Sequence, residues 1–259
     1  MSDANDDPQS AQRDCGTKPF ESENAAAFTD AACFIRQGKS ANADGANHDA
    51  RQHAEQQQII RWIEEAGVVR FTDEQIERIP LLSDDTSEHE VRLPFSGKRV
   101  FKKTWAGFYG QIPVWRDGKL ERILASPADY LERQALQNEV FASDLRLEGV
   151  NISDKPSMVL GQPSGQPSFV ISQGFIEAAD GTNPIPSMQQ IAAFLAEHGF
   201  SQVPGSYFGW VRYADGVAIV DAKLDNFILS VEGVVPIDLQ MARLPEVESE
   251  RPRIIAVSR

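Results

Sequence analysis

The sequence predicts an α+β fold that follows a polar, disordered leader. Three observations support the fold class and the leader. From about residue 85 the order of predicted elements is strands, helix, strands, helix, strands, which is typical of α+β folds. The hydrophobic share of 41% and the charged share of 24% are ordinary for a globular chain. The first fifty residues differ, because their apolar residues follow no period of 2 or 3.6.

The net charge and the residue types exclude several classes of function. The formal net charge is −13, and because an acidic chain is repelled by phosphates, we expect no direct binding of nucleic acid. No apolar stretch approaches the roughly 18 residues of a membrane span, and the N-terminus resembles no signal peptide. The spacing of the cysteines and histidines indicates neither a zinc site nor a disulfide framework. We therefore expect a cytoplasmic protein that does not contact a membrane.

Residues 1–50 form the acidic leader, with nine acidic and four basic side chains. Such a segment buries too little apolar surface to offset the entropy of ordering, so we predict that it is disordered. A short helix over Ala25–Arg36 is the alternative for part of it.

Residues 51–84 are predicted to form a helical lead-in. Apolar side chains recur with helical spacing from Ile59 to Ala66, and Gly67 ends that helix. A second helix is expected over Thr72–Arg78, capped by Thr72 and stopped by Pro80.

Residues 85–176 combine strands with the strongest helix signal of the chain. Alternating apolar residues predict a hairpin from His89–Leu93 and Lys98–Trp105. A Ser-Pro pair then opens a helix over Pro127–Ser143, since serine caps well and proline fits the first turn. Two further strands are expected at Met158–Leu160 and Ser168–Ile176.

Residues 177–259 contain one predicted helix and several short strands. The helix covers Ser187–His198 and is closed by a glycine. The strands are expected at Ala218–Val220, Phe227–Val231 and Val234–Ile237.

The stretch from Asp221 to Gln240 carries the residues that point to chemistry. It has an aspartate, an asparagine five residues later at Asn226, two apolar strands around a glycine turn, and a second aspartate, Asp238. Phosphoryl transfer needs such residues: one carboxylate orients the attacking hydroxyl, while an amide and a second carboxylate hold Mg²⁺ against the nucleotide phosphates. The D-x-x-x-x-N spacing is weak alone, but the strand–turn–strand that ends in Ile-Asp makes it more specific.

With these motifs the sequence resembles the protein-kinase-like superfamily. More specifically, it resembles the small serine/threonine/tyrosine-kinase-like domain of polyvalent proteins, which phages and conjugative elements carry. The matching stretches are Ser87–Val91, Arg99–Lys102, Tyr130–Arg133, Gln137–Phe141, Ser172–Glu177, Asp221–Asn226 and Pro236–Leu239. This resemblance implies a minimal two-lobed kinase-like fold, with an N-lobe over residues 85–176 and a reduced C-lobe over residues 177–259.

The resemblance also implies roles for single residues. The catalytic residues would be Asp221, as base, and Lys223, near the transferred phosphate. Asn226 and Asp238 would bind the metal. The nucleotide would be held by Lys102, by Glu139 as the partner of that lysine, and by the linker that contains Gln173 and Phe175. Lys103 and Glu132 are the alternatives to Lys102 and Glu139.

Departures from the family pattern leave two functions open. No glycine-rich G-x-G-x-x-G motif precedes Lys102, Val220 replaces the usual arginine, and no Phe-Gly follows Asp238. The first function is an ATP- and Mg²⁺-dependent transfer of phosphate to a hydroxyl acceptor, either a protein side chain or a small molecule. The alternative is an inactive pseudokinase module that binds nucleotide or protein.

Overall fold

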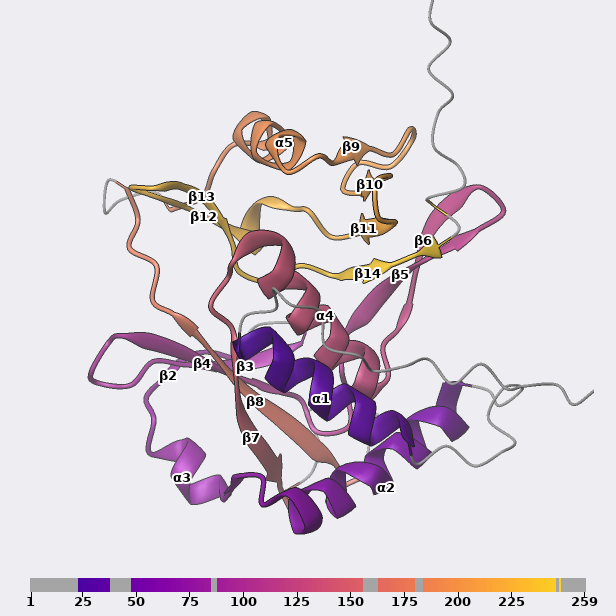
Figure 1. Ribbon diagram of the computed structural model, residues 1–259. Coiled ribbons are helices and arrows are strands. Elements are labelled where there is room, and N and C mark those ends of the chain that lie inside the picture. The colour runs from indigo at the N-terminus through magenta and orange to yellow at the C-terminus, as the bar shows by residue number, and fades with distance from the viewer. Residues whose placement is uncertain are drawn as a thin grey trace, which may run out of the picture.

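The computed structural model of the protein describes residues 23–37, 48–84, 88–155, 163–179, 184–245 and 247. Helices and strands occur together in these residues, and the strands form several separate sheets, which confirms the predicted α+β class. Figure 1 shows their arrangement around the long helix α4 (Pro127–Phe141). None of the helices in the described part of the chain combines the length and apolar character that crossing a membrane requires.

Apart from α4, most elements are short strands. The other helices are α1 (Glu23–Gln37), α2 (His48–Ala66), α3 (Asp73–Glu77), α5 (Met188–Glu197) and the 3₁₀ turn η2 (Leu224–Asn226). The strands are β1 (Arg70–Phe71), β2 (Leu81–Ser83), β3 (His89–Arg92), β4 (Arg99–Thr104), β5 (Gln111–Arg116), β6 (Lys119–Leu124), β7 (Arg146–Ile152), β8 (Pro167–Gly174), β9 (Ser201–Gln202), β10 (Trp210–Arg212), β11 (Val217–Ile219), β12 (Phe227–Ser230), β13 (Gly233–Pro236) and β14 (Met241–Arg243).

A six-stranded sheet and three helices enclose the first core. The strand order is β1-β7-β8-β4-β3-β2, and all pairs except β1–β7 are antiparallel. Helices α1, α2 and α4 bury their apolar sides with strands β7 and β8 in one cluster, which includes Phe28, Ile59 and Tyr130. The rings of Tyr130 and Phe169 stack with centroids 5.6 Å apart.

A second core lies on the other side of α4. It is formed by α5, by the hairpin β12–β13 and by a four-stranded sheet with the order β14-β11-β10-β9. Leu136 of α4 packs into this cluster, whereas Leu131 of the same helix belongs to the first core. Helix α4 lies between these two groups of elements (Figure 1). It therefore contributes side chains to both cores.

Capping residues set the helix boundaries that the sequence predicts. Ser126, Thr72 and Ser187 each accept a hydrogen bond from the third helical residue, and all three helices have complete capping boxes. Helix α4 ends two residues earlier than expected, because Ala142 adopts a left-handed conformation with φ of 51°.

Most predicted strands are present. The hairpin over His89–Leu93 and Lys98–Trp105 is confirmed as the β3–β4 pair, and the last three predicted strands correspond to β11, β12 and β13. The strand expected at Met158–Leu160 lies outside the described residues. Strands β5, β6 and β7 are absent from the sequence-based prediction.

The prediction of a disordered leader over residues 1–50 is wrong for its central part. Residues 23–37 form α1, whose side chains Phe28, Ala32 and Ile35 are at most 1% exposed. This helix confirms the alternative given for Ala25–Arg36, which the sequence indicates only weakly because alanines form much of the buried face. Cys33, on the same helix, is disulfide-bonded, contrary to the expectation from cysteine spacing.

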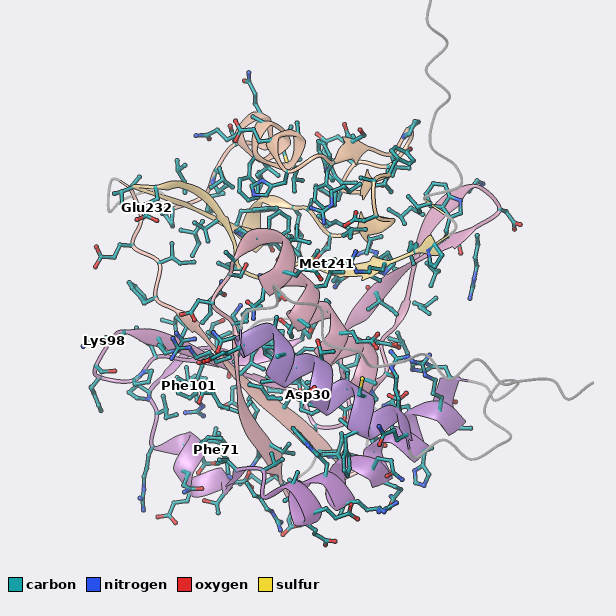
Figure 2. All side chains as sticks on the ribbon, viewed as in Figure 1. Asp30, Phe71, Lys98, Phe101, Glu232 and Met241 are labelled. Carbon is teal, nitrogen blue, oxygen red and sulfur yellow. The ribbon has the colours of Figure 1, made fainter. Side chains whose placement is uncertain are left out.

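A substitution on α1 tests whether this helix belongs to the folded core. We expect Phe28→Ala to lower the free energy of unfolding by about 3–5 kcal/mol, because it leaves a cavity in the first core. The matched control is Asp30→Ala, two residues away at an exposed position of the same helix (Figure 2), which should change stability by less than about 0.5 kcal/mol. Urea denaturation measures both. Equal stability of Phe28→Ala and wild type would contradict the packing of α1.

Candidate functional site

A cavity of about 530 Å³ lies between strands β3, β4 and β8 on one side and the segment around η2 and β13 on the other. Six of the eight residues that the sequence singles out line it together: Lys102, Gln173, Phe175, Lys223, Asn226 and Asp238. Segments that lie more than a hundred residues apart in the chain thus meet at one site. Asp221 adjoins the cavity through Asn226, whereas Glu139 lies elsewhere.

Lys102 enters the cavity because side chains alternate along strand β4. Its ammonium group donates to the carbonyl oxygen of Ile237 and lies 3.4 Å from Oε1 of Gln173. Burial lowers the pKa of Lys102 below its usual value, although the charges of Asp238 and Glu88 oppose this shift. The adjacent Lys103 takes the opposite face and pairs with Glu90 at 2.9 Å, so Lys102 is the lysine that faces the cavity.

Asp221 and Asn226 are locked to each other across the short loop that ends in η2. The Nδ2 group of Asn226 donates to the carboxylate of Asp221 at 2.8 Å and to its backbone carbonyl at 2.7 Å. Both residues are less than 10% exposed. The amide orientation leaves the carbonyl oxygen of Asn226 as the atom able to coordinate a cation.

Two cations flank the carboxylate of Asp221. Lys223 Nζ lies 3.6 Å from Oδ2, and Nη1 of Arg122, on strand β6, lies 3.6 Å from Oδ1. Lys223 is also 3.3 Å from Asp225, and these two carboxylates raise the pKa of Lys223 against the effect of its partial burial. The ammonium group therefore stays charged next to Asp221.

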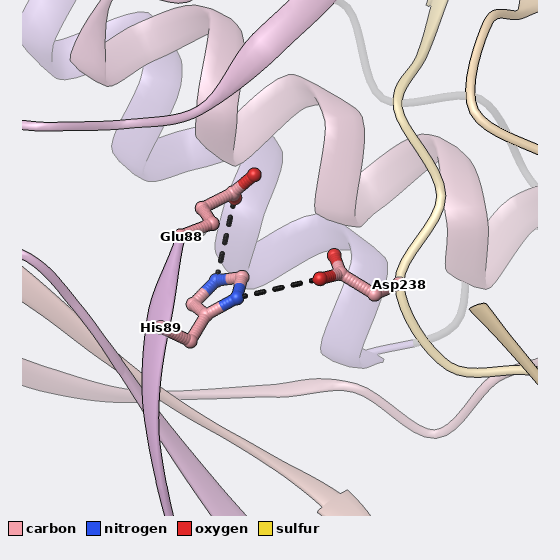
Figure 3. A group of neighbouring side chains, drawn as sticks. All are labelled: Glu88, His89 and Asp238. Carbon is pink, nitrogen blue, oxygen red and sulfur yellow. Dashed lines mark ion pairs between the residues drawn. The ribbon is translucent and has the colours of Figure 1, made fainter. Parts of the chain in front are cut away.

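Asp238 enters the same cavity from the segment after β13. Its Oδ2 lies 3.5 Å from Nδ1 of His89, and Nε2 of that ring lies 3.3 Å from Oε1 of Glu88 (Figure 3). Partial burial raises the pKa of Asp238, but His89, Lys102 and Arg133 outweigh it, so the pKa lies well below its ordinary value. Asp238 is therefore ionised at neutral pH.

Helix α4 holds this cluster through one of its faces. The buried guanidinium of Arg133 pairs with both oxygens of Glu88. One turn further, Gln137 accepts from the backbone N–H of Leu239 at 3.2 Å and donates to the carbonyl of Pro236 at 3.4 Å. Gln137 thus binds the backbone on both sides of Asp238.

The predicted pairing of Glu139 with Lys102 is wrong. Glu139 pairs with Arg243 and lines a separate cavity of about 520 Å³, and the alternative Glu132 pairs with Arg36 at 2.7 Å. The two glutamates are seven residues apart and share one face of α4, whereas Arg133 and Gln137 occupy the face toward β3. Among the described residues, no carboxylate forms an ion pair with Lys102.

The linker expected to hold the nucleotide lies at the cavity, and some of its polar groups are already hydrogen-bonded within the protein. The amide of Gln173 donates to the carbonyls of Ser143 and Pro236, so its side chain ties β8 to β13. The backbone N–H of Phe175 donates to the carbonyl of Lys98 at 3.0 Å. The Phe175 ring is 46% exposed and remains available as an apolar surface for a ligand.

The polar side chains around Asp238 offer two possible sets of cation ligands. Asn226 and Asp238 offer the amide and carboxylate oxygens that Mg²⁺ prefers, and both line the cavity. Glu88, His89 and Asp238 also offer ligand atoms within 4.8 Å of one another. However, both oxygens of Glu88 are bonded to Arg133, and a cation there would face that guanidinium. Asn226 with Asp238 is the better fit.

Sequence reasoning missed Glu88, His89 and Arg133. A scattered histidine such as His89 is expected at the surface, but it is 2% exposed and shares a strand face with Val91, which also lines the cavity. That alternation is visible in the sequence and could have placed His89 in the site.

Comparisons with protein-family models, with curated proteins and with solved structures find no match.

Removing the charge of Glu88 tests the importance of its pair with Arg133. We expect Glu88→Gln to lower the free energy of unfolding by about 3–5 kcal/mol, because it leaves a buried guanidinium without its counterion. Glu139→Gln is the matched control, since its pair with Arg243 is exposed and should contribute less than about 1 kcal/mol. Chemical denaturation measures the loss of stability in both variants. Similar losses would contradict the importance of the buried pair between Glu88 and Arg133.

Proposed function

We propose that the protein is an ATP- and Mg²⁺-dependent phosphotransferase that transfers a phosphoryl group to a hydroxyl acceptor. The observation that carries this proposal is the meeting of Lys102, Asn226 and Asp238 in one cavity, with Asp221 bonded to Asn226 beside it. A lysine for the phosphates, two oxygen ligands for a cation and a carboxylate for the acceptor are the parts that phosphoryl transfer needs.

The proposal includes a minimal, kinase-like division into two lobes. The N-lobe is the six-stranded sheet with α4, and the reduced C-lobe is α5 with the four-stranded sheet and the β12–β13 hairpin. Two features support this division: the cavity lies where the two groups of elements face each other, and separate apolar clusters fill them. ATP would lie in that cavity, with its base toward Phe175 and its phosphates toward Asp238.

The proposed chemistry assigns one task to each polar side chain. Asp221 accepts the proton of the acceptor hydroxyl, whose oxygen bonds to the γ-phosphorus while the bond to the β–γ bridging oxygen breaks and ADP leaves. Lys223 neutralises charge on the transferred group. Lys102 binds the α- and β-phosphates, and Asn226 and Asp238 hold the cation. Mg²⁺ supplies neutralisation of the phosphate charge.

Phosphate transfer from γ-labelled ATP tests the proposal. We expect wild type to label itself or an added hydroxyl acceptor, and Asp221→Ala to lower the rate at least about 100-fold, because the base is lost. Asp238→Ala should abolish labelling through loss of the cation. Asp154→Ala, an exposed aspartate away from the cavity, is the control and should label like wild type. Equal labelling by all four proteins would overturn the mechanism.

A second candidate function is nucleotide binding without turnover. It is favoured by Lys102, which donates to the carbonyl of Ile237 and has no carboxylate partner among the described residues. Val220 stands where the family pattern has arginine, which also favours nucleotide binding without turnover. A pseudokinase module of this kind would use the same cavity and the same cation ligands.

Thermal unfolding with nucleotide separates binding from catalysis. Both candidates predict that ATP with Mg²⁺ raises the melting temperature, by a few degrees once the ligand exceeds its Kd about 100-fold. Asp238→Asn should remove the part of this shift that depends on Mg²⁺ and keep the part caused by ATP alone. A shift without labelling would favour the binding module. Absence of any shift at millimolar ATP and Mg²⁺ would contradict both candidates.

A further inference from the structure

The β5–β6 hairpin contacts the first core through Ile112 and a third apolar cluster through its outer end. Its strands pair with each other and with no other strand in the described residues. Trp115 and Leu120 of the hairpin pack against a third apolar cluster, separate from the two cores, which includes Val211, Ala218 and Leu244. The hairpin directly precedes α4 in the sequence. Through these contacts it lies against strands β10, β11 and β14 (Figure 1).

Strand alternation places Arg122 beside the loop that begins at Asp221. Arg122 is two residues after Leu120 and shares its face of β6. Leu120 lies close to Gly209, where an added Cβ would come within 3.2 Å of the leucine and 2.3 Å of Ser206 Oγ. The neighbouring Phe208 accepts from the backbone N–H of Ala222, directly after Asp221. Glycine at 209 thus permits the close approach that brings Arg122 to 3.6 Å from Asp221.

The guanidinium of Arg122 has most of its hydrogen-bond donors available for a ligand. Its side chain is 50% exposed, and Asp221 is its one ion-pair partner in the described part of the chain. At 3.6 Å this contact is longer than a hydrogen bond, so the five N–H donors of the guanidinium are free to bind an anion. Lys223, in contrast, is shared between Asp221 and Asp225.

We propose that Arg122 selects the acceptor by binding an anionic group that the acceptor carries next to its hydroxyl. This inference rests on the proposed function, because it places the acceptor hydroxyl at Asp221. A hydroxyl bound there brings its neighbouring group within reach of the guanidinium, whose planar fork suits a carboxylate or phosphate. A cationic neighbour would be repelled by the same group. The substrate class is therefore a hydroxyl compound with an adjacent negative charge.

Charge reversal at Arg122 tests this selection. Phosphate transfer is measured to two serine peptides that differ only in the flanking residues, aspartates in one and lysines in the other. We expect wild type to favour the acidic peptide about tenfold in kcat/KM, and Arg122→Glu to reverse the preference by a similar factor. Arg116→Glu, a somewhat more exposed cation of the same hairpin, is the control and should keep the wild-type preference.

A small-molecule pair distinguishes the source of the anion. Glycerol 3-phosphate and glycerol are compared as acceptors in the same three proteins. A preference for glycerol 3-phosphate that Arg122→Glu removes, with no peptide labelling, assigns the site to small hydroxy anions. Transfer without a preference for either anionic acceptor, or a preference that Arg122→Glu leaves unchanged, overturns the inference and leaves the phosphotransferase standing. The absence of ATP-dependent transfer even in autophosphorylation, despite native thermal stability, instead counts against the phosphotransferase itself.

Discussion

The buried ion pair between Arg133 and Glu88 is the constraint on which the candidate site depends. A guanidinium as buried as that of Arg133 is tolerated only with a carboxylate partner in place, and this fixes the start of β3 against α4. His89 follows Glu88 directly and lies 3.5 Å from Asp238, the proposed cation ligand. Glu88 and His89 therefore connect the helix to Asp238. In this protein the helix is thus coupled to the site by Arg133, and not by a pair between Glu139 and Lys102.

The two N-terminal helices keep α4 in the position that this coupling requires. Asp129, in the first turn of α4, pairs with Arg36 of α1 at 2.8 Å and with Arg51 of α2 at 2.6 Å. Glu55 of α2 accepts from the backbone N–H of Ala128, which places a negative charge at the positive end of the α4 dipole. The segment that composition assigns to a leader and a lead-in therefore supports the helix that orients the site.

Local signals predicted much of the fold, but one local hairpin and the contacts between distant parts of the chain were missed. Capping serines and apolar alternation gave α4, α5 and the β3–β4 hairpin, because those signals lie within a few residues. The β5–β6 hairpin was missed although its Asp117-Gly118 turn, with φ of 50° and 73°, carries a common hairpin signal. For the site, the Asp221–Asn226 spacing identified the loop. The pair between Arg133 and Glu88 could not be predicted, because the two residues are far apart in the sequence and the glutamates near Arg133, Glu132 and Glu139, offer themselves first.

The charge of the whole chain and the charge of the site follow different rules. A net charge of −13 argues against binding polyanions over a broad surface, because that requires many cations on one face. A nucleotide cavity needs few, and here Lys102 and Lys223 both line the cavity, with Lys223 3.6 Å from Asp221. Their fields act over a few ångströms in a partly desolvated space, where opposite charges attract more strongly than in water. The acidity of the whole chain therefore does not argue against phosphate binding in the cavity. In the proposed acceptor selection, a single cation beside Asp221, Arg122, would favour anionic acceptors over cationic ones.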